Sequence, residues 1–232
     1  MRRSIQILAG ISVSLLAIVA FLVQKGALDS AGLPLLLQPD FTVSPATAAR
    51  IPDSGQRVAL AEGALRADPA TPYKWCALAE VLAEAGQMQQ ARFCIHRGVV
   101  LGRHLPPVLM RAANFHFQDG QIPKALEQTS QVLALVSSYD GIIFATYRRM
   151  GVPVETMLST GIPAKARALR SFFRHLLGWA DPEDVARGWD RLAALGYNDD
   201  QLAGRYLDYL LQRHLYDKAI QMWRQLDERA GD

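Results

Sequence analysis

Two segments of this 232-residue chain match each other at a spacing of 34 residues. In the first segment the matching positions are Pro72, Trp75, Leu78, Ala79, Leu82, Gly86, Ala91, Ile95 and Gly98. In the second segment they are Pro106, Leu109, Ala112, Ala113, His116, Gly120, Ala125, Thr129 and Val132. A repeat of this length predicts similar helical hairpins, each of which buries its apolar stripe only by stacking on its neighbours.

Small residues recur at the eighth and twentieth positions of the repeat, where the two helices of a hairpin are expected to cross closely. These residues are Ala79, Ala91, Ala113 and Ala125. Gly86 and Gly120 follow the first helix of each unit, where a left-handed residue ends a helix and begins a turn. The pattern therefore predicts helix-turn-helix units.

This pattern resembles the tetratricopeptide repeat. The resemblance implies an all-α, right-handed solenoid of helical hairpins that binds other proteins and catalyses no reaction. The same frame gives unit starts at 38, 72 and 106, and again at 166 and 200. Because the two sets are offset by 60 residues instead of 68, we expect a solenoid over 55–232 with a degenerate repeat at about 140–165. The alternative for that segment, a plain loop, would expose many apolar residues.

The N-terminus carries a long apolar run. After Met1-Arg2-Arg3, 15 of the 19 residues from Ile5 to Val23 are apolar, and about 20 helical residues span a bilayer. Residues 1–25 are therefore predicted to form a single transmembrane helix, with apolar anchor residues that include Ile5, Leu8, Leu15, Leu16 and Phe21. The paired arginines predict a cytoplasmic N-terminus and a periplasmic solenoid at the inner membrane. A cleavable signal peptide is the alternative.

A proline-rich linker is predicted at 26–54, between the anchor and the solenoid. Within it, Leu33-Pro34-Leu35-Leu36-Leu37 is unusually apolar for a free tether. Three explanations stay open: this stretch lies on the membrane surface, packs on the first hairpin or contacts a neighbouring membrane protein.

Charge is distributed unevenly along the solenoid. The formal net charge of +3 is modest and argues against a dedicated nucleic-acid binder. Residues 141–175 carry six basic residues against one acidic residue, whereas residues 176–232 carry 11 acidic residues against 7 basic ones. The middle of the solenoid is therefore basic and its C-terminal end acidic.

The resemblance also implies a ligand groove, because certain first-helix positions face the concave side of tetratricopeptide proteins. In the present frame the residues implied to bind a partner are Arg167, Arg170, Arg174, Asn114, Phe117, Gln118 and Tyr73. The three arginines share one helix face, and such a groove would suit an acidic or C-terminal peptide. The alternative is a solvated arginine face paired with nearby acids.

Cys76 and Cys94 are the two cysteines, and they fall on the two antiparallel helices of one predicted hairpin at similar height. Either they form a disulfide, which an oxidising compartment would allow, or they are two buried free thiols. Their spacing gives no metal-binding knuckle, and we expect neither a metal nor a cofactor.

Motifs of enzymes are missing from the sequence, which has no G-x-S-x-G, P-loop, H-E-x-x-H or dinucleotide fingerprint. Among the aromatic residues, the tryptophans Trp75, Trp189 and Trp223 are predicted to be core residues. Near the C-terminus an outer surface is expected to include Tyr206, Tyr209 and Tyr216.

The expected function is that of a membrane-anchored docking or assembly subunit of a cell-envelope complex, with protein partners at or near the membrane. One alternative is a permanent structural accessory subunit of an integral membrane complex. Another is an accessory factor in envelope polysaccharide metabolism, for which the sequence offers no candidate nucleophile or acid.

Overall fold

The computed structural model describes residues 53–230, and every regular element in that range is a helix. The elements in chain order are α3 (Ser54–Ala67), α4 (Pro72–Glu84), α5 (Met88–Leu101), α6 (Pro106–Gln118), α7 (Ile122–Leu135), α8 (Asp140–Arg149), α9 (Val154–Thr156), η3 (Met157–Gly161), α10 (Ala166–Leu176), α11 (Pro182–Ala194), α12 (Asp200–Gln212) and α13 (Tyr216–Ala230). The prediction of an all-α fold is confirmed for this part of the chain.

The predicted anchor at 1–25 and nearly all of the predicted linker lie outside the described residues. Among the helices from α3 to α13, none combines the length and the apolar character needed to cross a bilayer.

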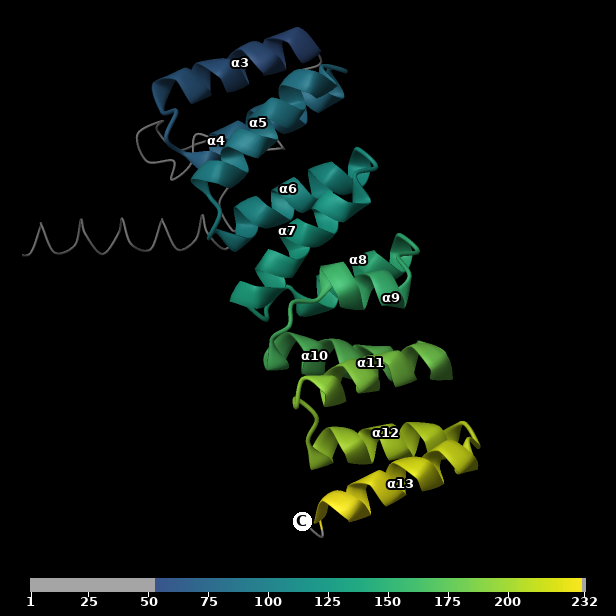
Figure 1. Cartoon of the computed structure of the whole chain (residues 1–232). Coiled ribbons are helices and arrows are strands. Elements are labelled where there is room, and N and C mark those ends of the chain that lie inside the picture. Colours follow the sequence, from purple (N-terminus) through teal and green to yellow (C-terminus); the bar gives the residue numbers. More distant parts are fainter. Residues whose placement is uncertain (1–52, 231–232) are drawn as a thin grey trace, which may run out of the picture.

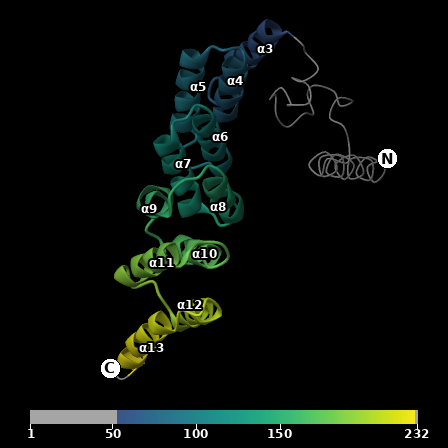
Figure 2. The same cartoon turned by 90° about the vertical axis from the view of Figure 1, so that its right-hand side faces the viewer.

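The helices form one elongated stack that runs from α3 at one end to α13 at the other (Figure 1). A first layer contains α4, α6, α8, α10 and α12, and a second layer contains α5, α7, α9, α11 and α13 (Figure 2). Consecutive helices pack in pairs, α4 on α5, α6 on α7, α10 on α11 and α12 on α13. The architecture is therefore a solenoid-like stack of helical hairpins.

The first helices of the regular hairpins end in the same backbone turn. Gly86 and Gly120 have φ angles of 76° and 72°, which glycine adopts without the steric cost that a Cβ brings. The amide of Gln87 then donates back to the carbonyl oxygen of Leu82 at 2.8 Å, and the equivalent bond follows Gly120. After α12 the left-handed position is held by His214, with a φ angle of 58°.

Close helix crossings explain the small residues of the repeat. The four alanines at the crossings are fully buried: Ala79, Ala91, Ala113 and Ala125. Gly98 on α5 lies so near α4 that an added Cβ would sit 2.9 Å from Cys76 Sγ and 3.3 Å from the carbonyl oxygen of Pro72. A larger residue at position 98 would therefore push the two helices apart.

The short segment between the regular units is a hairpin of α8 with α9 and η3. Its anchor is Tyr147, which is fully buried and whose hydroxyl donates to the carbonyl oxygen of Gly161 at 3.0 Å. The same hydroxyl lies 2.5 Å from Thr129 Oγ1 on α7, and burial raises the pKa of Tyr147. Thr129 stands where the preceding repeat has Ile95, and its hydroxyl takes part in this buried hydrogen-bond network.

The aromatic predictions near the C-terminus need correction. Trp189 is buried as predicted, but Trp223 on α13 is 65% exposed. Conversely, Tyr206 and Tyr209 are buried instead of surface-exposed, and the Tyr209 hydroxyl donates to the carbonyl oxygen of Ala180 at 2.9 Å. In the last hairpin Tyr206 and Tyr209 point inward, where Tyr206 packs against Phe173 of α10 and Trp189 of α11.

Candidate functional site

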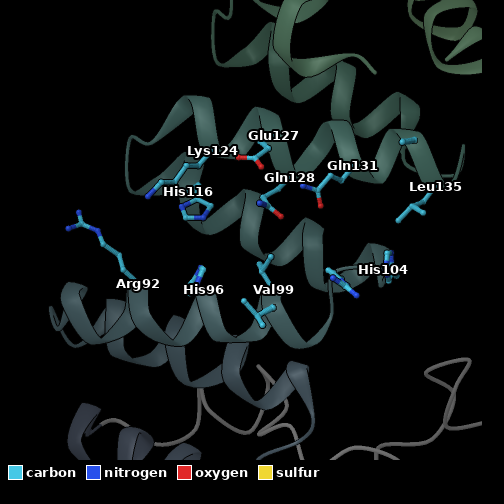
Figure 3. A pocket seen from close by; sticks show the side chains of 13 residues that line it. Arg92, His96, Val99, His104, His116, Lys124, Glu127, Gln128, Gln131 and Leu135 are labelled. Carbon is cyan, nitrogen blue, oxygen red and sulfur yellow. The ribbon is translucent and has the colours of Figure 1, made fainter. Parts of the chain in front are cut away.

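A concave space of about 790 Å³ lies between α5 and α7, the second-layer helices of two consecutive hairpins. We call it the α5–α7 groove. It exists because α5 packs chiefly on α4 and α6, so α7 is held at a distance. Figure 3 shows the side chains of the two helices pointing toward one another, with His116 of α6 between them. The polar and basic lining includes Arg92, His96, Arg103, His104, Lys124 and Gln131.

Two buried polar side chains form part of this lining. His116 and Gln128 are each only 8% exposed. Within the described residues, neither the Nδ1 atom of His116 nor the Oε1 atom of Gln128 has a hydrogen-bond partner. Buried polar atoms are nearly always satisfied in folded proteins, so two such atoms in one groove are unusual.

The electrostatics of the groove favour a neutral His116. Burial lowers the pKa of this imidazole, the nearby Lys124 lowers it further, and Asp119 acts in the opposite direction. The imidazole is therefore a neutral hydrogen-bonding group at neutral pH. Within residues 53–230, Arg103, Lys124 and the single lining carboxylate Glu127 form no ion pair.

One end of the groove is fixed by a two-point ion pair. Arg92 of α5 donates through Nε and a terminal nitrogen to the two carboxylate oxygens of Asp119, at 2.8 and 2.7 Å. Gln121 also donates to this carboxylate. The hydrogen bond from Arg92 is the main reason that the pKa of Asp119 is lowered. The pair joins α5 to the end of α6 and so holds the width of the groove at that end.

A second groove of about 500 Å³ lies in the first layer, and we call it the α4–α6 groove. Two residues predicted to bind a partner, Asn114 and Gln118, line it and are exposed. Beside them, Arg111 donates to both carboxylate oxygens of Glu80 at 2.8 and 2.7 Å and to the carbonyl oxygen of Tyr73 at 3.3 Å. Tyr73, also predicted to bind, is half-buried.

Phe117 does not belong to either groove, contrary to the prediction. It is buried, with 9% of its surface exposed, and its ring meets that of Tyr147 edge-on at 6.4 Å. The prediction failed because the short hairpin that follows brings Tyr147 of α8 against this position.

The three predicted arginines on α10 are not one free row. Arg167 donates to Asp140 Oδ2 at 2.8 Å and to the carbonyl oxygens of Leu133 and Val136. Arg170 donates to the carbonyl oxygen of Tyr197 at 2.7 Å and lies 3.5 Å from Asp199. Both arginines thus connect neighbouring hairpins.

Arg174 is exposed and forms no ion pair with another described residue. Arg167 and Arg170 therefore pair with nearby groups, as the alternative prediction for this helix face has it.

Cys76 and Cys94 are two buried free thiols and not a disulfide, which is the second of the two alternatives given by the sequence. Burial raises the pKa of Cys76 to about 11, with opposing smaller effects of Arg111 and Glu80. Burial also raises the pKa of Cys94, as does Glu62 of α3. The two thiols have different surroundings: Cys76 Sγ lies against Gly98 of α5, and the charge of Glu62 of α3 acts on Cys94.

No group of three or more histidine, cysteine, aspartate or glutamate side chains within residues 53–230 is arranged to hold a metal ion. His96 and His104 both line the α5–α7 groove, together with His116.

His116 and Gln128 were not identified as site residues from the sequence, although a signal existed. They occupy the eleventh and twenty-third positions of their repeat, where the preceding repeat has Leu82 and Cys94. A polar residue at two positions that are otherwise apolar could have indicated a site. Their meeting in one groove with Arg103 and Lys124 depends on the spacing of α5 and α7.

Neither a scan against protein-family models nor a search of curated proteins gives a match for this chain. The resemblance to the tetratricopeptide repeat therefore remains a prediction from the 34-residue spacing.

Proposed function

We propose that this protein is a non-enzymatic docking scaffold that binds a partner protein through the α5–α7 groove. The observation that carries the proposal is the pair of buried, unpartnered polar atoms on His116 and Gln128 in a groove of about 790 Å³. Such atoms gain hydrogen bonds when a ligand that fills the groove reaches them.

The chemistry of the groove supports binding instead of catalysis. Its lining contains neither a hydroxyl nor a thiol side chain, so it offers no side-chain nucleophile of those kinds. Its one carboxylate, Glu127, is exposed. These properties suit recognition of a ligand by charge and hydrogen bonding.

The proposed location is the periplasmic side of an inner membrane, with the solenoid anchored by the N-terminal apolar run. The paired arginines before Ile5 and the uncharged stretch up to Val23 support this location. Partners at or near the membrane are the ones that such an anchor brings within reach.

Affinity purification of the full-length protein from gently solubilised native membranes tests the docking function. We expect a protein partner to co-purify and to be lost when Arg103 and Lys124 are both changed to Glu. Lys218→Glu is the matched control, since Lys218 is an exposed helix lysine at the far end of the stack. Co-purification that survives the double variant, or that fails for the wild type, would contradict the proposal.

A second candidate function, a permanent accessory subunit of an integral membrane complex, is favoured by one observation. The last hairpin exposes four large apolar side chains, Leu211 at 48%, Tyr216 at 55%, Ile220 at 51% and Trp223 at 65%. Exposed apolar clusters are typical of lasting contacts. A fixed stoichiometry after size exclusion would favour this candidate, whereas a substoichiometric partner would favour a transient scaffold.

A further inference from the structure

The α5–α7 groove offers hydrogen-bonding groups of both kinds. Gln128 Oε1 is an acceptor that needs a donor, and the neutral imidazole of His116 in the same lining has an Nδ1 that is unpartnered among the described residues. A peptide unit supplies one N–H donor and one C=O acceptor. A sulfate or a fully ionised phosphate group supplies acceptors only, so it cannot satisfy Gln128 Oε1.

The charges around these atoms favour an acidic ligand. Lys124 and His104 lie toward opposite ends of the groove, with Lys124 near His116 (Figure 3). Arg103 precedes His104 just after the end of α5, so the two cations Lys124 and Arg103 belong to opposite ends. Arg92 is neutralised by Asp119, and Glu127 is the one carboxylate of the lining. Acidic side chains on both sides of a central peptide unit would meet these two cations.

The length of the groove limits the ligand. The helix α5 has 14 residues, which corresponds to about 20 Å. An extended chain rises about 3.3 Å per residue, so about six residues fit along the helix.

We propose that the α5–α7 groove binds a short, extended, acidic segment of a partner protein. His116 and Gln128 hydrogen-bond one of its peptide units, and Lys124 and Arg103 contact acidic side chains on either side. The inference rests on the proposed docking function and names the chemistry of the partner. The site lies in the second helix layer, on the opposite side of the stack from the groove that the repeat resemblance implied.

Fluorescence anisotropy of the full-length protein in detergent, with two pools of fluorescein-labelled octapeptides, tests the inference. One pool has Glu or Asp at alternate positions and mixed residues elsewhere, and the other has Lys at the same alternate positions. We expect saturable binding of the acidic pool and none of the basic pool. Lys124→Glu should abolish the binding, and Lys218→Glu should leave it unchanged.

His116→Phe and Gln128→Leu separate recognition of the backbone from attraction of charge. Each variant removes an unpartnered buried polar atom, so the melting temperature should stay the same or rise. Each should nevertheless weaken binding of the acidic pool by about tenfold, because one hydrogen bond to the peptide is lost. A residue with a purely structural role would not combine lost binding with retained stability.

Inorganic polyphosphate is the competing probe. If polyphosphate binds as tightly as the acidic peptides and the His116 and Gln128 variants bind both equally well, the groove is only an anion site and the inference is wrong. Failure of the acidic pool to bind also overturns it. The docking function would still stand in either case if a partner co-purifies and is lost with the Arg103 and Lys124 double variant.

Discussion

The α4–α6 and α5–α7 grooves are formed by the same two hairpins on opposite layers, yet their charges are arranged differently. In the α4–α6 groove every charged lining residue has a partner within the fold, as the pairs Arg111 with Glu80, Arg57 with Glu84 and Arg92 with Asp119 show. In the α5–α7 groove two cations and two buried polar atoms have none among the described residues. The pairs of the first groove hold the hairpins together, whereas the second groove keeps charged and polar groups that have no partner within the described fold.

The largest expected effect on stability comes from disrupting the hairpin of α4 and α5, which contributes one helix to each groove. Gly98→Ala should lower the free energy of unfolding by about 1–3 kcal/mol, because the new Cβ would meet Cys76 Sγ at 2.9 Å and the backbone of Pro72. Gly63→Ala is the matched control on α3, where an added Cβ meets nothing within 4 Å.

The control should leave stability unchanged or raise it by up to about 1 kcal/mol, since alanine favours a helix. Urea unfolding followed by circular dichroism measures both variants. Equal effects would mean that α4 and α5 are not closely packed at Gly98.

The next largest effect on stability compares a paired cation of the α4–α6 groove with a cation of the α5–α7 groove that is unpaired among the described residues. Arg111→Met should cost about 1 kcal/mol, because it removes a two-point hydrogen bond to Glu80 that is partly screened by solvent. Lys124→Met in the α5–α7 groove should change the free energy of unfolding by less than about 0.5 kcal/mol. The contrast fails if the two variants are equally destabilised in the same urea experiment.

A smaller effect concerns pH and the buried histidines. Burial lowers the pKa of both His116 and His175, so below about pH 6.5 the unfolded state binds more protons than the folded state. The contribution of the two neutral histidines to the free energy of unfolding should therefore be fully present at about pH 7.5 and be lost progressively toward about pH 5.5. His116→Phe should reduce this loss in melting temperature, while the remaining loss comes from His175, whose pKa Arg148 also lowers. A variant with an undiminished pH dependence would show that His116 stays accessible to protons in the folded state.

The smallest effect is expected from reducing agents. Because Cys76 and Cys94 are free and buried, a reductant should leave the melting temperature unchanged. Both thiols should react with a thiol reagent only after denaturation, because burial raises their pKa values and blocks access. A drop in melting temperature on reduction would instead indicate a disulfide.

Local features of the fold could be predicted from the sequence because their causes are local. The alanines at crossings and the left-handed turns at Gly86 and Gly120 are required by any closely packed hairpin. The irregular contacts could not be predicted in this way. Arg167 is satisfied by the carbonyl oxygens of Leu133 and Val136, and these are within its reach only because α7 ends at Leu135, next to α10.

The candidate site was harder to predict than the fold. Asn114 and Gln118 do line a groove, but that groove has its charges paired. The polar character of His116 and Gln128 is visible in the sequence, whereas their burial and lack of partners depend on how far α5 and α7 are held apart. That distance follows from the packing of four helices and not from any one segment.

Site-specific photo-crosslinking in native membranes compares the two grooves most directly. A photo-reactive amino acid would replace Gln131, which lines the α5–α7 groove, or Gln118, which lines the α4–α6 groove. We predict a crosslinked partner protein from position 131 that is lost with Lys124→Glu, and none from position 118. A partner captured at position 118 but not at position 131 would contradict the assignment of the docking site to the α5–α7 groove.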